Sequence, residues 1–527
     1  MIFGNFTGFS KANRKVGDQN ESGMGHWMRL ARVVWIGLVI VATTQVPTVW
    51  GLDMKVVAKS AAKVVAESGN LVQATTPAQL ILGELLERGT VDIPVTMPLE
   101  APEDGAIPAP VDPIPSITLA EAIDSTYQGS PEVGAQAALA KANRWIARSS
   151  LGKLGPKLDV EYSRGREHSS ASGDAGNVTP VVLPYHTRTD QSMVLRQPVV
   201  DLQAVAAWKR DDRLADAEHS KLSQTRANVA FDVSSAYYDL VQYQLLVVLA
   251  KEQFSRTGNL LNYMTRRAAG GGATVADRER VRAASLNANR DLLDARSQLS
   301  HAQMTFARLT GLLPGQVVVT QESFREMPSN PEQAMERVLN SSPSLSALRQ
   351  QMEAASFDRK STQAGVLPKF ELQLGDYRST NASGTPGSTR DARIMLTMRM
   401  NLFNGGSEYA VSQAQAQQQV QLREQYEDTI RKTRERLQTN YLNLAAIHRQ
   451  ASIAREEVQA NLSVADAFDA QFASANRSLL DVLTAYEKLY ASRVSLIKLF
   501  VSERRAVFQI LKDTGDMTTL DFARMGS

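Results

Sequence analysis

Residues 156–162 read PKLDVEY, and residues 368–374 read PKFELQL. In both stretches a Pro-Lys pair opens an alternation of apolar and polar residues, which predicts a strand with one apolar face. A Ser-Pro pair precedes each stretch, at 130–131 and at 342–343, so that the two copies are offset by 212 residues. Because a period near 200 residues is far too long for a solenoid repeat, this pattern predicts a duplicated structural unit.

The duplication extends over most of the chain. The segment 199–201 matches 402–404, Tyr238 matches Tyr441, and the Thr-Gly pair at 310–311 matches the pair at 514–515, with offsets of 203 to 204 residues. We predict a first repeat over residues 116–315, a second repeat over residues 316–515 and a C-terminal tail over residues 516–527.

Each repeat is predicted to contain the same elements in the same order. A pair of short helices, over 119–151 or 332–364, is interrupted at the Ser-Pro pair and followed by a strand. A loop rich in Ser, Gly, Asn and Pro, over 169–185 or 379–391, leads to a returning strand. The chain then enters a helix of about 65 to 70 residues, over 202–268 or 407–472, which is roughly 100 Å long.

The long helices carry a heptad pattern that predicts packing against other helices. Apolar residues recur every seven positions, as Val233, Leu240, Val247, Phe254 and Leu261 in the first repeat and as Ile430, Leu437, Leu444, Ala451, Val458, Ala465 and Phe472 in the second. Each long helix ends at a turn, and a partner helix of about 35 residues runs back to Gly311 or Gly515. The predicted fold class is therefore mainly α, with long helical hairpins and a small β contribution.

Composition excludes several classes of function. The net charge is only +3, so the chain lacks the basic field of a nucleic-acid-binding protein. It contains no cysteine, and its six histidines show no metal-ligand spacing. We find no catalytic constellation and predict neither an enzyme nor a cofactor.

The N-terminus predicts export from the cytoplasm. Arg29 and Arg32 precede an apolar run over 33–42, which is typical of a secretory signal and too short to span a bilayer as a helix. We assign residues 1–51 to a signal peptide, with the true start near Met28. Residues 52–115 form an extension with a proline-rich linker, which favours an extended tether.

The strands suit a membrane barrel. Bacterial barrels need at least about eight strands, whereas this chain supplies four, so several copies must share one barrel to pair every strand edge in lipid. The apolar faces would contact outer-membrane lipid. The polar residues predicted to face the barrel lumen are Lys157, Asp159, Glu161, Lys369, Glu371 and Arg399.

Three short motifs, in this order on a duplicated chain behind a signal peptide, resemble the TolC family of outer-membrane export channels. They are TLAEA at 118–122, LFNGG at 402–406 and RSLLDVL at 477–483, and the resemblance covers residues 117–515. It implies a homotrimer with a twelve-stranded barrel and a periplasmic helical tunnel. It also implies that docking of an inner-membrane transporter, of the ABC or another type, through a periplasmic adaptor (a membrane-fusion protein) opens the closed tip.

The same resemblance selects residues near the tip. Family channels close with rings of aspartate just after the second tip, and Asp481 matches the first ring, whereas Thr484 occupies the place of a second aspartate. Three converging carboxylates would repel one another and bind cations; alternatively, Asp481 stabilises a helix N-terminus by about 0.3–1 kcal/mol. Asp277 is the matching residue of the first repeat, where we expect a capping role. The predicted tip and adaptor contacts are Gly270, Gly271, Gly272, Ala475, Asn476, Arg477 and Ser478.

Three functions remain open. The tip sequence 477–483, with Tyr486 and Glu487, favours a channel for type I protein secretion, and the lack of a lipidated cysteine agrees. Drug or metal efflux is the second candidate. A periplasmic adaptor or scaffold without a pore is the third, and it leaves the two lipid-patterned hairpins unexplained. The extension over 52–115 is expected to pack on the outside of the tunnel or to tether the protein to the cell wall.

Overall fold

The computed structural model describes residues 95–100, 116–169, 185–319, 327–474 and 477–518. All of them belong to one unit of the chain, which spans residues 75–527. The predicted signal peptide, most of the extension over 52–115, most of the tail over 516–527, and Ala475 and Asn476 lie outside the described residues.

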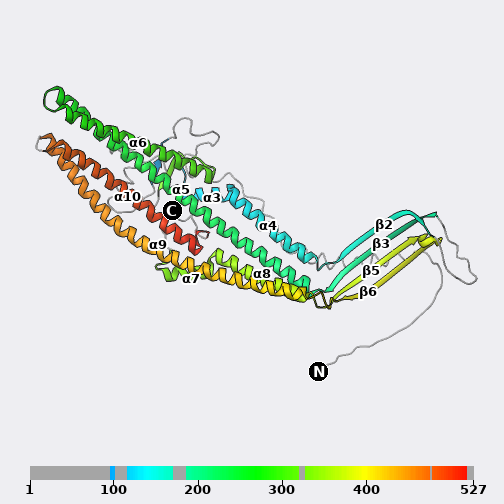
Figure 1. The fold of residues 1–527 in the computed structure, drawn as a ribbon. Helices are drawn as coiled ribbons and strands as arrows, with labels where there is room; N and C mark the ends of the chain where they lie inside the picture. Colours follow the sequence, from blue (N-terminus) through cyan, green and yellow to red (C-terminus); the bar gives the residue numbers. More distant parts are fainter. Residues whose placement is uncertain (1–94, 101–115, 170–184, 320–326, 475–476, 519–527) are drawn as a thin grey trace, which may run out of the picture. The chain divides into compact units, whose positions relative to one another are not determined.

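The two halves contain the same six elements in the same order, as the sequence predicts (Figure 1). The first half runs through α3 (Leu119–Gly129), α4 (Pro131–Gly152), β2 (Lys157–His168), β3 (Tyr185–Val200), α5 (Leu202–Ala269) and α6 (Val275–Thr310). The second half runs through α7 (Pro331–Ser341), α8 (Pro343–Ala364), β5 (Lys369–Thr380), β6 (Ser388–Arg399), α9 (Ser407–Ala473) and α10 (Leu479–Thr514). The long helices α5 and α9 contain 68 and 67 residues, which confirms their predicted length.

Local chemistry explains the breaks between the short helices. Thr118 and Glu121 form a reciprocal capping box at the start of α3. Ser130 then ends α3 and caps α4, while Pro131 stands at the first helical position, where its missing N–H is not needed. The Ser-Pro pair at 342–343 separates α7 from α8 in the same way, although Ser342 makes no side-chain cap.

Two predictions need correction. The loop predicted over 379–391 is shorter, because β5 continues to Thr380 and β6 begins at Ser388; a 3₁₀ turn, η2 (Ala382–Gly384), lies between them. Within the predicted heptads, Val233, Leu240 and Val247 are fully buried, but Phe254 is 37% exposed. In the second repeat, by contrast, Leu437, Leu444, Val458 and Ala465 all remain buried, so the apolar stripe is interrupted at Phe254 only in the first repeat.

The helices form a layer in which α5 is central. It contacts α4, α6, α8 and α10, while α9 packs on α8 and α10 (Figure 1). The main core gathers side chains from α3, α5, α6 and α10, including Tyr237, Phe306 and Phe508. Among the described residues, no helix combines the length and the apolar character needed to cross a membrane.

A small second sheet was not predicted. Residues of the N-terminal extension form β1 (Val95–Pro98), which pairs antiparallel with β4 (Gln316–Val319) at the start of the second half. Met97 is fully buried. The part of the extension that the structure describes is therefore extended, as the prolines predicted, but it packs on the helices instead of hanging free.

Glu100 fixes the end of this strand to the first hairpin. Its carboxylate forms ion pairs with Lys251 of α5 and with Arg296 of α6, the latter at 3.0 Å. Its backbone N–H donates to Gln244 at 3.1 Å, and its carbonyl accepts from Gln303 at 2.8 Å. Burial acts to raise the pKa of Glu100, but the hydrogen bonds and charges of Lys251 and Arg296 together outweigh it and hold this pKa below its ordinary value.

We expect Glu100→Gln to loosen β1. A hydrogen bond to a charged group contributes about 1.5–3 kcal/mol to stability. Because the partners here are partly exposed, we expect the substitution to cost only about 1 kcal/mol. Local opening should then increase about fivefold, measured as faster amide hydrogen exchange at residues 95–97. Glu424→Gln, at an exposed glutamate of α9, is the matched control and should leave that exchange unchanged.

The effect of Glu100 should depend on pH. Because its folded-state pKa is lowered, the stabilisation of β1 is present above the ordinary carboxyl pKa and is lost as the pH falls through the folded-state value. Protection of β1 in the wild type should therefore fall in acid toward that of Glu100→Gln. Identical protection of both proteins at pH 7 would contradict the anchoring role.

Candidate functional site

One face of the four-stranded sheet collects the polar residues singled out in the sequence. The strand order is β2-β3-β5-β6, antiparallel throughout. Residues directly opposite each other point to the same side, and side chains alternate along a strand. Lys157 pairs with Arg196, Arg196 with Gln373, and Lys369 with Arg399, so these residues lie on one side of the sheet, which we call the polar face. The polar face carries all six residues predicted to face the lumen: Lys157, Asp159, Glu161, Lys369, Glu371 and Arg399.

Charges of opposite sign are interspersed on the polar face. Arg196 forms an ion pair with Asp159, and Arg188 lies 2.7 Å from Asp190 and 3.4 Å from Glu167. Where the strands join the helices, Lys369 Nζ donates to Gln203 at 2.5 Å. Here a hollow of about 570 Å³ is lined by residues that include Gly365, Lys369, Arg399, Asn401 and Glu408.

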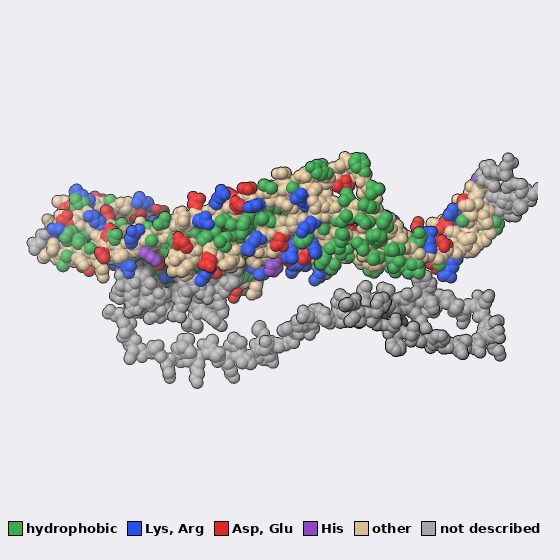
Figure 2. Space-filling view, turned by 90° about the horizontal axis from the view of Figure 1, so that it is seen from below, with side chains coloured by type: hydrophobic (Ala, Val, Ile, Leu, Met, Phe, Trp, Pro, Cys, Tyr) green, Lys and Arg blue, Asp and Glu red, His purple; other side chains and the backbone are tan. Residues whose placement is uncertain are grey.

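The opposite side of the sheet, the apolar face, is exposed over a large area. Val160, Ile394 and Leu396 are 73%, 72% and 66% exposed. The other apolar residues of this face are Leu158, Tyr162, Met193, Leu195, Phe370, Leu372, Leu374 and Met398. Figure 2 shows further hydrophobic side chains gathered on the part of the helices that adjoins the sheet. Contiguous apolar surface of this extent marks contact with lipid or with another chain.

The sheet also has two open edges. β2 and β6 are the outer strands, each 12 residues long, and they run in opposite directions. An edge strand presents a row of backbone N–H and C=O groups that another strand can pair with. A second copy of β2 placed against β6 would continue the antiparallel order without interruption.

The two hairpin tips are built alike, and each places an aspartate in the first turn of its second helix. In the first tip, Gly271 adopts a positive φ of 77°, which favours glycine, and Arg267 donates to the Gly272 carbonyl at 3.0 Å. Thr274 then caps α6: its hydroxyl accepts from the Asp277 N–H at 3.1 Å and donates to the Asp277 carboxylate at 2.7 Å. Thr274 is therefore the N-cap residue of α6, and Asp277 lies in the first turn beside it.

The second tip repeats this cap with a difference in charge. Ser478 accepts from the Asp481 N–H at 3.2 Å. The Asp481 carboxylate lies 3.4 Å from the Arg477 guanidinium, which stacks on Phe468 at 3.9 Å. Thr484 is exposed one turn further along α10. Asp481 therefore lies in the first turn of α10, where its N–H is capped by Ser478 and its carboxylate lies beside the Arg477 cation.

A set of contacts behind the tips was missed by the sequence analysis. The tip network consists of Glu252 and Arg256 of α5, Asp469 of α9, and Tyr486 and Arg493 of α10. Arg493 donates to both carboxylate oxygens of Glu252, at 3.0 and 3.1 Å, and is only 12% exposed. Arg256 pairs with Glu252 at 3.2 Å, approaches Asp469 at 3.9 Å and lies 5.1 Å from the Tyr486 ring centre. These contacts join the first helical hairpin to the second.

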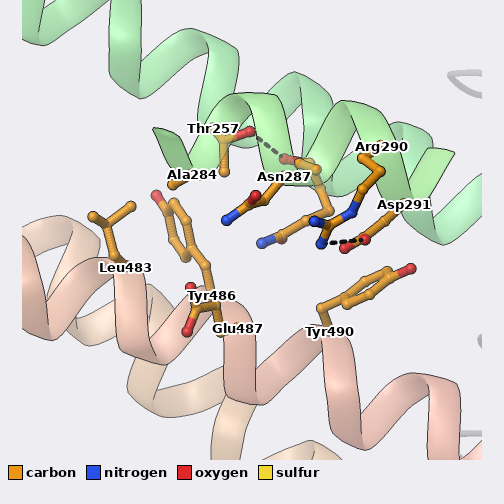
Figure 3. Close-up of a pocket in the computed structure, with 11 residues that line it drawn as sticks. Thr257, Ala284, Asn287, Arg290, Asp291, Leu483, Tyr486, Glu487 and Tyr490 are labelled. Carbon is orange, nitrogen blue, oxygen red and sulfur yellow. Dashed lines mark hydrogen bonds and ion pairs between the residues drawn. The ribbon is translucent and has the colours of Figure 1, made fainter. Parts of the chain in front are cut away.

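Tyr486 connects this network to a groove between the hairpins. Its hydroxyl donates to Asp469. Burial, reinforced by this hydrogen bond, raises the pKa of Tyr486 far above that of an ordinary phenol, so the hydroxyl remains a donor at any physiological pH. The groove, about 230 Å³, lies between α5 and α6 on one side and α10 on the other, where Asn287 and Asp291 face Leu483 and Tyr490 (Figure 3).

Comparison with known proteins gives the class. The family model described as "Outer membrane efflux protein" matches residues 334–512. The outer membrane efflux protein BepC of Brucella suis is 23% identical over 303 residues, which cover 57% of this chain and 66% of BepC, just under two thirds. TolC of Escherichia coli is 23% identical over 72% of this chain and 79% of its own, and the alkaline protease secretion protein AprF of Pseudomonas aeruginosa is 21% identical over 69% and 77%.

The fold agrees with these sequence matches. The solved structure of the outer membrane protein VceC of Vibrio cholerae superimposes with a TM-score of 0.65 at 15% identity, over 75% of this chain and 96% of VceC. The predicted resemblance to the TolC family of outer-membrane efflux proteins is confirmed by the family model, the relatives and the fold. The predicted location is likewise confirmed: the outer membrane of a Gram-negative bacterium, with the helices in the periplasm.

We expect Tyr486→Phe to loosen the tip of the second hairpin. The lost hydrogen bond to a partly exposed carboxylate contributes about 1 kcal/mol, which corresponds to about fivefold more frequent local opening. Amide hydrogen exchange over residues 479–490 should rise accordingly. Tyr490→Phe, one turn along the same helix, is the control, because its hydroxyl forms no hydrogen bond with a described residue. Equal amide exchange in Tyr486→Phe and Tyr490→Phe would show that the Tyr486 hydroxyl does not stabilise the tip.

Proposed function

We propose that three copies of this chain close a twelve-stranded barrel in the outer membrane and continue it into a periplasmic tunnel, which together form the exit duct of an export system. The observation that carries this proposal is the four-stranded sheet with an exposed apolar face, a polar face and two open edges. In lipid an open edge leaves backbone groups unpaired, and pairing β6 with β2 of the next copy satisfies them. Three times four strands gives an even number, as in bacterial barrels.

The two faces of the sheet support the same arrangement. The apolar face would contact lipid, and the polar face, with Lys157, Asp159, Glu161, Lys369, Glu371 and Arg399, would line a water-filled pore. The helices α5 and α9, at about 1.5 Å per residue, extend roughly 100 Å and suit a tunnel across the periplasm. A scaffold without a pore would have no use for the apolar face.

Opening is proposed to occur at the tips. The first and second hairpins are held together by the tip network, so their separation requires the ion pair between Glu252 and Arg493 to break. A periplasmic adaptor that binds Gly270, Gly271, Gly272, Arg477 and Ser478, with Ala475 and Asn476, would supply the free energy through its preference for the open state. An inner-membrane transporter of the ABC or another type would drive the cargo, because the duct itself has no energy source.

Asp481 is the proposed constriction residue. Three copies around one axis would bring three carboxylates together and attract cations. Each Asp481 carries its own Arg477 at 3.4 Å, so the ring would be weakly acidic, and Thr484 one turn away adds no charge. Asp277 makes the same capping contact in the other tip and is the natural comparison.

Current through the purified oligomer in a planar lipid bilayer tests the duct. We expect discrete conductance steps, with Tyr486→Phe opening more often than the wild type. Divalent cations should block Arg477→Gln at lower concentration than the wild type and Asp481→Ala at higher concentration, by about threefold or more in each case, because the first variant unmasks the carboxylate and the second removes it.

Asp277→Ala is the matched control and should leave the block unchanged. If Asp277→Ala and Asp481→Ala have the same effect, capping explains both and the constriction is refuted. If correctly assembled oligomers of the wild type and of Tyr486→Phe carry no current, the duct is refuted and the scaffold takes its place.

For the cargo we propose protein, through type I secretion. The tip sequence 477–483 and the similarity to AprF, named for alkaline protease secretion, support this choice. Efflux of drugs or metals is the second candidate, supported by the similarity to BepC, named as an efflux protein. Cells that lack the chain should lose one or more proteins from the culture medium while their susceptibility to dyes and metals stays the same. The reverse result would assign efflux.

A further inference from the structure

The apolar face changes character along the strands. One row across the sheet, formed by Leu158, Leu195, Leu374 and Ile394, is entirely apolar. Two rows farther from the helices, the residues directly opposite one another are Tyr162, Gln191, Arg378 and Arg390. Beyond this row, Arg164 and Arg166 point to the same side, because they continue the alternation from Tyr162. We call Arg164, Arg166, Arg378 and Arg390 the arginine border.

The arginine border is exposed and carries excess positive charge. All four side chains are exposed. Among the strand residues described on this face, Asp376 is the single acid, and it pairs with Arg390 at 3.0 Å and with Arg378 at 3.5 Å. Arg164 and Arg166 form no ion pair with a described residue. Four cations and one anion leave a net charge of +3 on this part of the face.

The opposite face at the same level shows no such excess. There Arg188 is balanced by both Glu167 and Asp190. Positive charge in the outer half of the sheet is therefore concentrated on the side that carries the apolar rows. A channel lining that attracts anions would show the reverse distribution.

The position of the border limits what it can bind. In the proposed barrel, on which this inference rests, the hairpin turns point away from the periplasmic helices, so the border lies where the apolar surface ends toward the outer leaflet. An arginine on the lipid face is costly at the midplane and much less so at the interface. The exposed Tyr162 at the same level is typical of an interfacial aromatic girdle.

We propose that the arginine border binds the phosphate groups of a phosphorylated glycolipid in the outer leaflet, the chemical class of lipid A. Guanidinium groups match phosphate oxygens in bidentate geometry, and an unpaired guanidinium beside an apolar surface fits a ligand that carries phosphate above acyl chains. Arg390 lies on one edge strand and Arg164 and Arg166 on the other, so barrel closure would bring these arginines of neighbouring copies together. The glycolipid would then also strengthen the joint between copies.

Binding of bis-phosphorylated lipid A to the detergent-purified full chain, measured by native mass spectrometry, tests this proposal. We expect the wild type to bind lipid A at least tenfold more tightly than the same lipid after removal of both phosphates. Arg164→Gln with Arg166→Gln, and separately Arg378→Gln with Arg390→Gln, should each lower the affinity for lipid A at least tenfold. Inorganic phosphate at the same concentration should displace little lipid A.

The matched control is Arg188→Gln with Arg393→Gln, which should bind lipid A like the wild type. Arg393 lies on the polar face, because it is opposite Gly375, two residues along β5 from Gln373. Equal affinity for the phosphorylated and dephosphorylated lipids, equal losses in the control and test variants, or full displacement by inorganic phosphate would each overturn the proposal. Conductance of the same preparations in a bilayer without lipid A separates the two proposals. If the wild type conducts but binds the phosphorylated and dephosphorylated lipids equally, only the proposed glycolipid site is refuted. If the wild type does not conduct, the proposed duct is refuted.

Discussion

The backbone of β2 and β6 sets the condition that the rest of the molecule has to meet. As the edge strands of the described sheet, each presents polar groups along 12 residues. In water such an edge invites uncontrolled pairing, and in lipid every unsatisfied group costs several kcal/mol. In the proposed barrel, each of these edges would therefore pair with a strand of a neighbouring copy. Because β2 and β6 run in opposite directions, β2 of one copy could pair antiparallel with β6 of the next.

Strand pairing between copies would also depend on the helices. Strands from separate copies pair only if the copies are held in a fixed arrangement, and the short sheet offers little surface to do so. In the proposed trimer, the helices α5 and α9 would supply a far longer contact surface and would carry the chain away from the membrane. Exposed apolar side chains on α4, such as Trp145 and Ile146 at 66% and 53% exposure, would be available for contact with a second copy in that trimer.

Stability is distributed unevenly along the long hairpins. Near the middle, large side chains such as Tyr237, Phe306 and Phe508 fill a continuous core, and β1 is fastened there through Glu100. Toward the tips a smaller core remains, and charged contacts such as that between Glu252 and Arg493 join the hairpins. Charged pairs exchange more readily than a packed apolar core, because water and other charges can replace each partner. This distribution suits a structure that stays assembled while its tips separate.

The sequence by itself determined the order and type of the main elements and the two faces of the strands. Alternation with a period of two residues and apolar spacing of about 3.5 are local properties, so PKLDVEY and PKFELQL fix which side chains share a face before any strand has a neighbour. Only the tertiary structure decided the pairing of β1 with β4, the tip network and the alignment of the arginine border. Arg493 and Glu252 lie 241 residues apart, and Arg390 meets Arg378 only through strand register. Such contacts depend on how distant segments are brought together, and a charged residue on a helix or strand looks the same in the sequence whether it faces water, a partner or a lipid phosphate.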